Sequence, residues 1–273
     1  MSVTYTATLP VGEQTVAVLT GVLDAERTRR GTRAGTRSLT SHNQAVLILR
    51  WFLDGTRMQQ LGTDNTISTS TAYDYLHEGI DVLAARAPGL HCALPAAKAA
   101  GYSHVGIDGT VIETDRCTAP GPTDGVDLWW SGKHHQHGGN VQVMTVPDGR
   151  PIWTCDVRPG REHDTTAVRA HPEILPCLTE TLHDLRALGD LGYEGEADTI
   201  TVAFKTPAQS HPTPLQQMFN KAHNGLRAIG ERGHALLKMT LRALRNTSLD
   251  PRRIGKIVAA ALVLLHLEHH RTT

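Results

Sequence analysis

The sequence has few aromatic residues, few cysteines and no long apolar run. Phenylalanine, tyrosine and tryptophan together make up 4% of its 273 residues. The cysteines lack metal-ligand spacing and no secretory signal precedes them, so we expect reduced thiols in a cytoplasmic protein. They are Cys92, Cys117, Cys155 and Cys177. The apolar run at residues 257–267 has 11 residues, which suits a buried helix and is too short to cross a membrane.

Net charge is also absent, because 27 Lys and Arg balance 27 Asp and Glu. The whole-chain charge therefore does not indicate a nucleic-acid partner, but its distribution does. Residues 227–273 carry nine basic and three acidic residues (9 − 3 = +6), and residues 1–57 carry seven arginines and four acids (7 − 4 = +3). Two basic ends around an acidic middle favour a phosphate-binding protein with a metal site. An ordinary solvated surface is the alternative.

The N-terminal third contains a basic segment and then a helical pattern. Residues 1–38 include an arginine run at positions 27–37, which predicts either a basic arm on a phosphate backbone or a short helix and loop. Residues 39–90 predict a helix, a short helix, a turn and a further helix with Ser68 as its N-cap. This order is the outline of an all-α helix-turn-helix DNA-binding domain.

The last helix of a helix-turn-helix lies in the major groove with its first side chains on base edges. The candidate base-reading residues are Thr69, Ser70, Thr71, Asp74 and Tyr75. This helix has no Lys or Arg before Arg86, which is unusual for a DNA reader. A three-helix bundle that binds nothing is the alternative.

The rest of the chain predicts an α/β catalytic domain. After a linker at residues 91–103, short apolar strands are expected at 104–112, 140–146, 151–157, 185–188 and 199–204. A hairpin turn is expected at residues 147–150 and broken helix at 165–182. Two more helices follow, one from residue 214 and one after Asp250-Pro251. The domain thus covers residues 104–273, with no internal repeat.

The helix from residue 214 has a clear start and an unusual middle. Thr213 as N-cap, Pro214 at the first position and Gln216 at the third are typical of a helix start. Gly230 and Gly233 each cost up to about 1 kcal/mol against alanine inside a helix. We expect them where another element approaches closely; a curved or broken helix is the alternative.

Three acids stand where they could meet. Asp108 lies in the first strand, Asp190 ends the fourth, and Glu231 lies on a helix face with Arg227 and Lys238. Converging carboxylates repel and favour a divalent cation, and their hard oxygens suit Mg²⁺ or Mn²⁺. Two such ions about 4 Å apart serve phosphoryl transfer. The side chains of Arg227 and Lys238 would then face DNA phosphate. Ordinary surface acids with an i,i+4 ion pair are the alternative. None of the histidine-rich stretches has zinc spacing.

These motifs together resemble the DDE-type transposases of bacterial insertion sequences, in the IS-five branch of the larger IS-four-like group. The final family motif is tyrosine, two residues, arginine, three residues, glutamate, six residues and lysine. This chain has Asn224, Arg227, Glu231 and Lys238 at that spacing, with asparagine in place of tyrosine. The family's Asp-Lys-Gly-Tyr-x-Gly run is matched by residues 190–195, with Leu191 in place of lysine.

Other parts of the chain add to the resemblance, which covers roughly residues 39–245. Asp108-Gly109-Thr110 matches the strand motif of the first acid, and Ser131-Gly132-Lys133 and residues 159–164 are also similar. The resemblance implies a ribonuclease-H-like mixed sheet flanked by helices. Asp108, Asp190 and Glu231 would be catalytic metal ligands for two Mg²⁺ or Mn²⁺ ions, and Lys133, Arg227 and Lys238 would contact DNA.

The implied reaction is metal-dependent cleavage and strand transfer of double-stranded DNA at the terminal inverted repeats of an insertion sequence. It implies a homodimer or larger assembly on DNA, with the protein on the bacterial nucleoid and not in a membrane. Two alternatives share the fold. One is an inactive or repurposed DNA-binding regulator, and the other is a plain metal-dependent nuclease.

Overall fold

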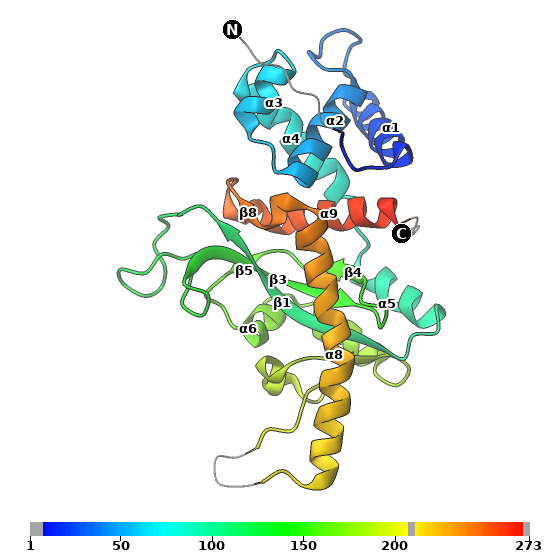
Figure 1. Ribbon diagram of the computed structural model, residues 1–273, viewed down its shortest axis with the longest axis vertical. Helices are drawn as coiled ribbons and strands as arrows, with labels where there is room; N and C mark the ends of the chain where they lie inside the picture. Colours follow the sequence, from blue (N-terminus) through cyan, green and yellow to red (C-terminus); the bar gives the residue numbers. More distant parts are fainter. Residues whose placement is uncertain (1–7, 207–210, 270–273) are drawn as a thin grey trace.

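The computed structural model describes residues 8–206 and 211–269, and the side chain of Glu231 lies outside the described set. A cluster of helices stands on an α/β body (Figure 1). The cluster consists of α1 (Glu13–Arg29), α2 (Ser41–Asp54), α3 (Met58–Asp64) and α4 (Thr69–Ala84). Of the described helices, none is both long and apolar enough to cross a membrane.

Helix α1 occupies most of the segment expected to be a basic arm. Its residues Leu19 and Leu23 lie one turn apart and are fully buried where α1 packs on α2 and α4. Burial of this apolar stripe stabilises a helix that an isolated chain would hold only marginally. From residue 13 onward the expected arm is therefore corrected to a helix followed by a loop, with the arginines at its C-terminal end.

The starts of α2 and α4 follow from their caps. The Thr40 hydroxyl accepts the backbone N–H of Asn43, and the Ser68 hydroxyl accepts that of Thr71, which confirms Ser68 as an N-cap. Helix α3 continues through Asp64, so the turn expected at residues 62–65 comes later, where Thr66 has a φ of 55°. The Ile67 N–H donates to the Gly62 carbonyl at 2.9 Å, so this turn folds back against the helix.

Two helices join the cluster to the body. Helix α5 (Leu90–Ala99) covers most of the segment expected to be a linker, because Leu90, Ala93, Leu94 and Ala97 form an apolar stripe that is buried. Helix α9 (Ile254–Glu268) packs against α4 and lies between the cluster and the sheet (Figure 1). Asp81 on α4 accepts hydrogen bonds from Arg253 at 3.1 Å and Lys256 at 2.8 Å. The C-terminal end of the chain thus contributes to the same core as the N-terminal helices.

The body contains a mixed sheet built around β1 (His104–Thr114). On one side β1 pairs antiparallel with β3 (Gln136–Thr145), and on the other it pairs parallel with β6 (Arg186–Leu188), which is followed by β7 (Ile200–Thr201). The remaining strands are β2 (Trp130–Ser131), β4 (Pro151–Thr154) and β5 (Arg158–Pro159) on β3, and β8 (Asn246–Thr247) on β1. The five predicted strands are confirmed as β1, β3, β4, β6 and β7, with shifted ends. The strands β2, β5 and β8 were not predicted, because two residues are too few to give a periodic signal.

Helices and short helical turns flank the sheet. They are α6 (Asp164–Arg169), α7 (Ile174–Thr181), α8 (Pro214–Thr240), η1 (Leu191–Glu196), η2 (Arg242–Leu244) and η3 (Pro251–Arg253). The broken helix expected at 165–182 is α6 and α7, separated at residues 170–173. The predicted hairpin turn is confirmed, since Val146 N–H donates to the Arg150 carbonyl and Gly149 has a φ of 83°. This mixed α/β architecture positions the site.

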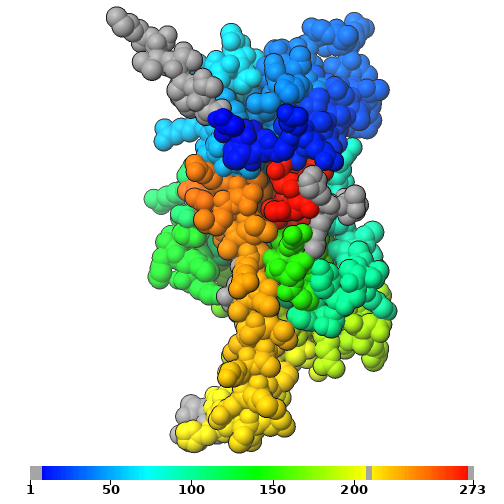
Figure 2. All heavy atoms as spheres, turned by 45° about the vertical axis from the view of Figure 1, so that its right-hand side comes forward, coloured from blue at the N-terminus to red at the C-terminus, as the bar shows by residue number. Residues whose placement is uncertain are grey.

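Helix α8 is unbroken, and its glycines are contact points. Thr213 and Gln216 form the predicted capping box. A Cβ on Gly230 would lie 2.8 Å from Thr145 Oγ1, and one on Gly233 would lie 2.6 Å from Thr145 Cγ2 and 2.9 Å from the Gly149 carbonyl oxygen. The expectation of close approach to another element is therefore confirmed: α8 packs directly on the β3–β4 hairpin. Its N-terminal half extends beyond the body (Figures 1 and 2).

Candidate active site

Asp108 lies on β1, and Asp190 follows two residues after the end of the adjacent parallel strand β6. The register pairs His104 with Arg186 and Gly106 with Leu188, an offset of 82 residues. The same offset separates Asp108 from Asp190, so both acids lie level with each other where β6 ends. Equal rise along paired strands explains how residues so far apart in sequence meet.

The neighbourhood of Asp108 disfavours its charge. Its side chain is 32% exposed. Burial, followed by the carboxylates of Asp190 and Asp164, raises the pKa of Asp108 to about 6, although Arg227 opposes the shift. Asp190 is also the N-cap of η1, since its Oδ1 accepts the Gly192 N–H at 2.8 Å. Three described carboxylates and one guanidinium thus share this end of the sheet.

Asp164, at the start of α6, is the acid that sequence reasoning missed. A Cβ added to Gly109 would lie 1.9 Å from Asp164 Oδ1, and one added to Gly192 would lie 3.5 Å from Asp164 Oδ2. The carboxylate therefore sits over the backbone beside Asp108 and reaches toward the turn that holds Asp190. This explains why glycine follows Asp108. The run at residues 159–164 was the only sequence signal, and it suggested no role.

A buried polar chain holds Asp164 in place. Its Oδ1 accepts hydrogen bonds from Asn140 Nδ2 at 3.0 Å and from Gln142 Nε2 at 3.3 Å. The Tyr193 hydroxyl donates to Gln142 Oε1, and both side chains are fully buried. Because the amide oxygen of Gln142 accepts the hydrogen bond from Tyr193, its amide nitrogen faces Asp164. The turn that carries Asp190 and the strand beneath Asp164 are thus connected.

Removing the Tyr193 hydroxyl tests this series of hydrogen bonds. Tyr193→Phe leaves Gln142 Oε1 buried without its donor, so we expect a loss of about 1–3 kcal/mol in unfolding free energy. Denaturant unfolding measures it. Tyr73→Phe, at a half-exposed tyrosine away from this site whose hydroxyl makes no hydrogen bond within the described residues, is the control for losing a hydroxyl. Equal losses in the two variants would show that the Gln142 contact contributes nothing particular.

Helix α8 brings three further residues to this end of the sheet. His223 contacts the Gly189 carbonyl at 2.9 Å, next to Asp190. Arg227 is close enough to lower the pKa of Asp108. His234, which sequence reasoning missed, has its Nδ1 3.8 Å from Asp108 Oδ2. Burial and Lys238 lower the pKa of His234 to about 4, so this imidazole is neutral at pH 7.

The other α8 predictions have mixed outcomes. Lys238 Nζ donates to the Val111 carbonyl at 3.0 Å and is partly buried, and its contact with DNA phosphate stays a prediction. Glu231 lies on α8 between the two contact glycines, and its side chain is outside the described residues, so its role stays a prediction. Asn224 and Leu191, which differ from the familiar motifs, are both exposed.

A hollow of about 430 Å³ opens beside the carboxylates. Gly109, Asn140 and Asp164 form one side, and Trp130, Lys133 and Arg161 are among the other lining residues. Lys133 is exposed here. The buried Ser131 hydroxyl and Arg161 Nη1 have no hydrogen-bond partner among the described residues. The hollow therefore offers cations, unused donors and an aromatic face next to the acids.

Comparison with known proteins identifies the body of the chain. Residues 107–266 match the sequence profile of the DDE superfamily endonucleases. The chain belongs to this family. Among curated proteins, none matches the chain. The matched range of this DDE endonuclease begins one residue before Asp108 and includes Asp190 and Glu231.

Two solved structures resemble the endonuclease weakly. One is the Mos1 transposase paired-end complex with the left transposon end, at 10% identity, covering 89% of this chain and 83% of that chain, with a TM-score of 0.21. The other is the Mos1 strand transfer complex, at 11% identity, covering 96% and 97%, with a TM-score of 0.22.

The donor set of the endonuclease suits a hard divalent cation. Asp108, Asp164 and Asp190 offer carboxylate oxygens, the ligands that Mg²⁺ and Mn²⁺ prefer. Their mutual repulsion, expressed in the raised pKa of Asp108, would be relieved by a cation. Within residues 8–206 and 211–269, with the Glu231 side chain left aside, no three His, Cys, Asp or Glu side chains form a ready metal site.

The raised pKa of Asp108 predicts a pH-dependent stability. The folded pKa of Asp108, about 6, exceeds the ordinary value of 3.8. The contribution of the protonated Asp108 to the free energy of unfolding is therefore fully present below pH 3.8 and is lost as the pH rises through 6. Without added metal, Asp108→Asn is therefore expected to stabilise the protein at pH 8 by about 1–2 kcal/mol, allowing for solvent screening. At pH 4 we expect almost no effect.

Thermal unfolding in EDTA measures this difference, with the exposed Asp198→Asn as the control. Mg²⁺ should then raise the Tm of the wild type more at pH 8 than at pH 5, since cations bind ionised carboxylates. If Asp108→Asn were less stable than the wild type at pH 8 in EDTA, a buried charge would not be the cause of the shift.

The proposed base-reading residues differ in exposure. Thr69, Ser70 and Asp74 are exposed and Thr71 is half-buried at the start of α4. Tyr75 is 4% exposed, and its hydroxyl accepts the Leu39 N–H at 3.0 Å. Tyr75 is therefore corrected from a base reader to a core residue, because position 75 falls on the α4 face that packs on α2.

Proposed function

We propose that this endonuclease is a transposase that cleaves and joins DNA strands at the ends of an insertion sequence of the IS-five type. The observation that carries the proposal is the closeness of Asp108 on β1 and Asp190 just after the neighbouring strand β6, which raises the pKa of Asp108, within the range that matches the endonuclease family. A ribonuclease-H-like organisation of the mixed sheet, with Glu231 as the third acid, is part of the proposal.

The proposed chemistry has two balanced steps. In the first, a water oxygen attacks phosphorus at an element end, a P–O bond forms, and the P–O3′ bond breaks to leave a 3′-hydroxyl and a 5′-phosphate. In the second, that 3′-hydroxyl attacks a target phosphodiester, and the target's own 3′-oxygen leaves with the proton. In each step one P–O bond forms and one P–O bond breaks, so no oxidant or energy source is needed.

The chain's residues would act by holding and orienting the reacting groups. Asp108, Asp190 and Glu231 would hold two Mg²⁺ or Mn²⁺ ions, which activate the attacking oxygen and stabilise the leaving one. Arg227 beside Asp108 and Lys133 in the neighbouring hollow would contact non-bridging phosphate oxygens. Asp164, held by Asn140 and Gln142, would keep the Asp190 turn against β1. The hollow would receive the strand beside the scissile bond.

The proposed partner is double-stranded DNA carrying the element's inverted repeats, and then target DNA. The exposed side chains of Thr69 and Ser70 and the half-buried Thr71 would approach the bases from α4. Two DNA ends must be joined to one target, so we propose a homodimer or larger assembly on DNA. Such a partner would keep the protein at the bacterial nucleoid.

Cleavage of the predicted substrate tests the proposal. The substrate is duplex DNA carrying the inverted repeats that flank the gene, incubated with Mg²⁺ or with EDTA, and Glu231→Gln is the matched variant. We expect nicking at the repeat ends with Mg²⁺ only, lost in the variant, and joined products when target DNA is added. Cleavage without joining would favour a plain nuclease, and tight binding without cleavage would favour an inactive regulator.

A further inference from the structure

Arginines line a hollow between α1 and α2, away from the carboxylates. The hollow measures about 420 Å³, and Arg27, Arg33 and Arg37 line it together with Thr40 and Ser41 at the start of α2. Asp24 is the one acid in its lining, and its carboxylate accepts the Ser41 hydroxyl. Three cations thus face one concave surface, next to the positive end of a 14-residue helix.

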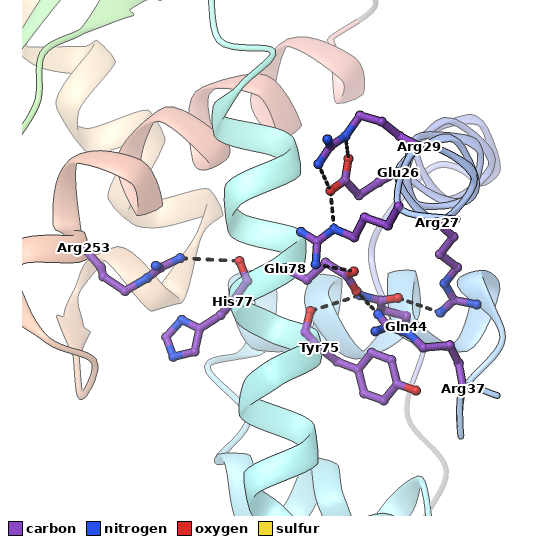
Figure 3. Close-up of polar contacts among 10 residues, drawn as sticks. Glu26, Arg27, Arg29, Arg37, Gln44, Tyr75, His77, Glu78 and Arg253 are labelled. Atoms are coloured by element: carbon purple, nitrogen blue, oxygen red, sulfur yellow. Dashed lines mark hydrogen bonds and ion pairs between the residues drawn. The ribbon is translucent and has the colours of Figure 1, made fainter. Parts of the chain in front are cut away.

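Two of these arginines, Arg27 and Arg33, have no carboxylate partner within the described residues. Arg27 donates to the neutral amide oxygen of Gln44 at 2.7 Å, and no hydrogen bond or ion pair engages the Arg33 side chain within the described residues. Arg37 is bonded to the buried Glu78 and lies 4.8 Å from the centre of the Tyr75 ring. Figure 3 shows Arg27 and Arg37 on the same side of α4, opposite Arg253.

The local charge is positive after every neighbouring acid is counted. The three arginines of the hollow meet two acids, Asp24 in its lining and Glu78 beside Arg37, which leaves +1 (3 − 2). Glu26 is occupied by Arg29 and Arg30, whose hydrogen bonds lower its pKa to about 2. In addition, the Nε atoms of Arg27 and Arg37 are buried without a partner in the described structure. These donors indicate an anionic ligand.

The start of α4 has none of these properties. Its exposed side chains are uncharged or acidic, and the Ser68 hydroxyl lies 2.8 Å from those of both Ser70 and Thr71. Neutral side chains do not supply the electrostatic part of DNA affinity, which comes from Lys and Arg on phosphates. Tyr75, which lies beside Arg37 of the hollow, is about 9 Å along α4 from Thr69 at 1.5 Å per residue. One duplex can therefore reach both the hollow and the start of α4.

We propose that the arginine hollow, formed by Arg27, Arg33 and Arg37 with the start of α2, binds the phosphate backbone of duplex DNA. The inference rests on the proposed DNA-cleaving function and adds the surface that holds the duplex. The hollow supplies the affinity and its salt dependence, and the start of α4 supplies at most base contacts. Because phosphate contacts carry no sequence information, this surface binds element and non-element DNA alike.

Salt dependence of binding tests the inference. The full chain is titrated with a labelled duplex carrying the element ends over a series of KCl concentrations. The slope of log K against log salt is negative, and each lost phosphate contact makes it shallower by about 0.9. We therefore expect Arg33→Gln to make the slope shallower by about 0.9 and Arg27→Gln with Arg33→Gln by about twice that. Arg33→Lys should retain the slope, since it keeps the charge.

The control is Arg29→Gln, because Arg29 is 70% exposed on α1, is paired with Glu26 and is not part of the hollow. We expect its slope to equal that of the wild type. A wild-type slope in both the Arg33→Gln and the double variant would overturn the proposed role of the arginine hollow. The proposed function would stand, provided that the wild type binds DNA. Absence of DNA binding by the wild type would overturn the proposed function as well.

Discussion

Asp190→Asn is expected to abolish metal-dependent cleavage while leaving the affinity for DNA nearly unchanged. The substitution removes the negative charge opposite Asp108 and, with it, a proposed metal ligand. We expect the cleavage rate to fall by at least about 10³-fold, which corresponds to about 4 kcal/mol of barrier. Asparagine is as good an N-cap as aspartate, so the hydrogen bond from Gly192 that starts η1 is retained. Single-turnover cleavage and DNA titration on one protein preparation measure both quantities.

The matched control for this variant is Asp198→Asn, at an exposed acid after η1. It makes the same chemical change eight residues away (198 − 190) and should cleave like the wild type. If Asp190→Asn lost DNA binding together with cleavage, Asp190 would act in the structure and not in the chemistry. Retained cleavage in Asp190→Asn would remove this residue from the proposed metal site.

Gly233→Ala is expected to destabilise the protein by about 1–3 kcal/mol, because an added methyl group meets two neighbours that cannot both move. Its Cβ would lie 2.6 Å from Thr145 Cγ2 and 2.9 Å from the Gly149 carbonyl oxygen, and Gly149 has a φ of 83° in its turn. Relief requires α8 to shift away from the hairpin. Since Glu231 lies on α8 two residues earlier, we also expect weaker cleavage. Denaturant unfolding and the cleavage assay measure the two effects.

The same helix provides a control at Gly225. No described residue outside the neighbouring turns lies within 4 Å of a Cβ at that position, so Gly225→Ala should stabilise α8 by up to about 1 kcal/mol. A second comparison uses Gly230→Ala, whose Cβ meets Thr145 Oγ1 and no other described atom. Combining it with Thr145→Ala should recover part of the loss, as a favourable coupling energy in a double-mutant cycle. If all three glycine variants behaved alike, helix propensity and not close packing would explain them.

Local features of the fold were predictable because they depend on neighbouring residues. The capping box of Thr213 and Gln216 and the N-cap at Ser68 are built by hydrogen bonds over three residues. The hairpin turn at residues 147–150 needs only its own chemistry. Other features were left open because burial decides them. Residues 13–29, where an arm and a short helix with a loop were both open, and residues 90–99 in the expected linker become helices because other elements cover their apolar stripes. Tyr75 is withdrawn from solvent for the same reason.

The sequence by itself determined the strand and helix order, the identities of Asp108, Asp190 and Glu231 as candidates, and the family to which their spacing belongs. Only the tertiary structure decided that Asp108 and Asp190 lie level, since the parallel register of β1 and β6 is a long-range pairing. It also added Asp164, turned Lys238 onto the Val111 carbonyl, and gathered three arginines at the α1–α2 junction. Each of these depends on contacts between distant segments, which local periodicity does not encode.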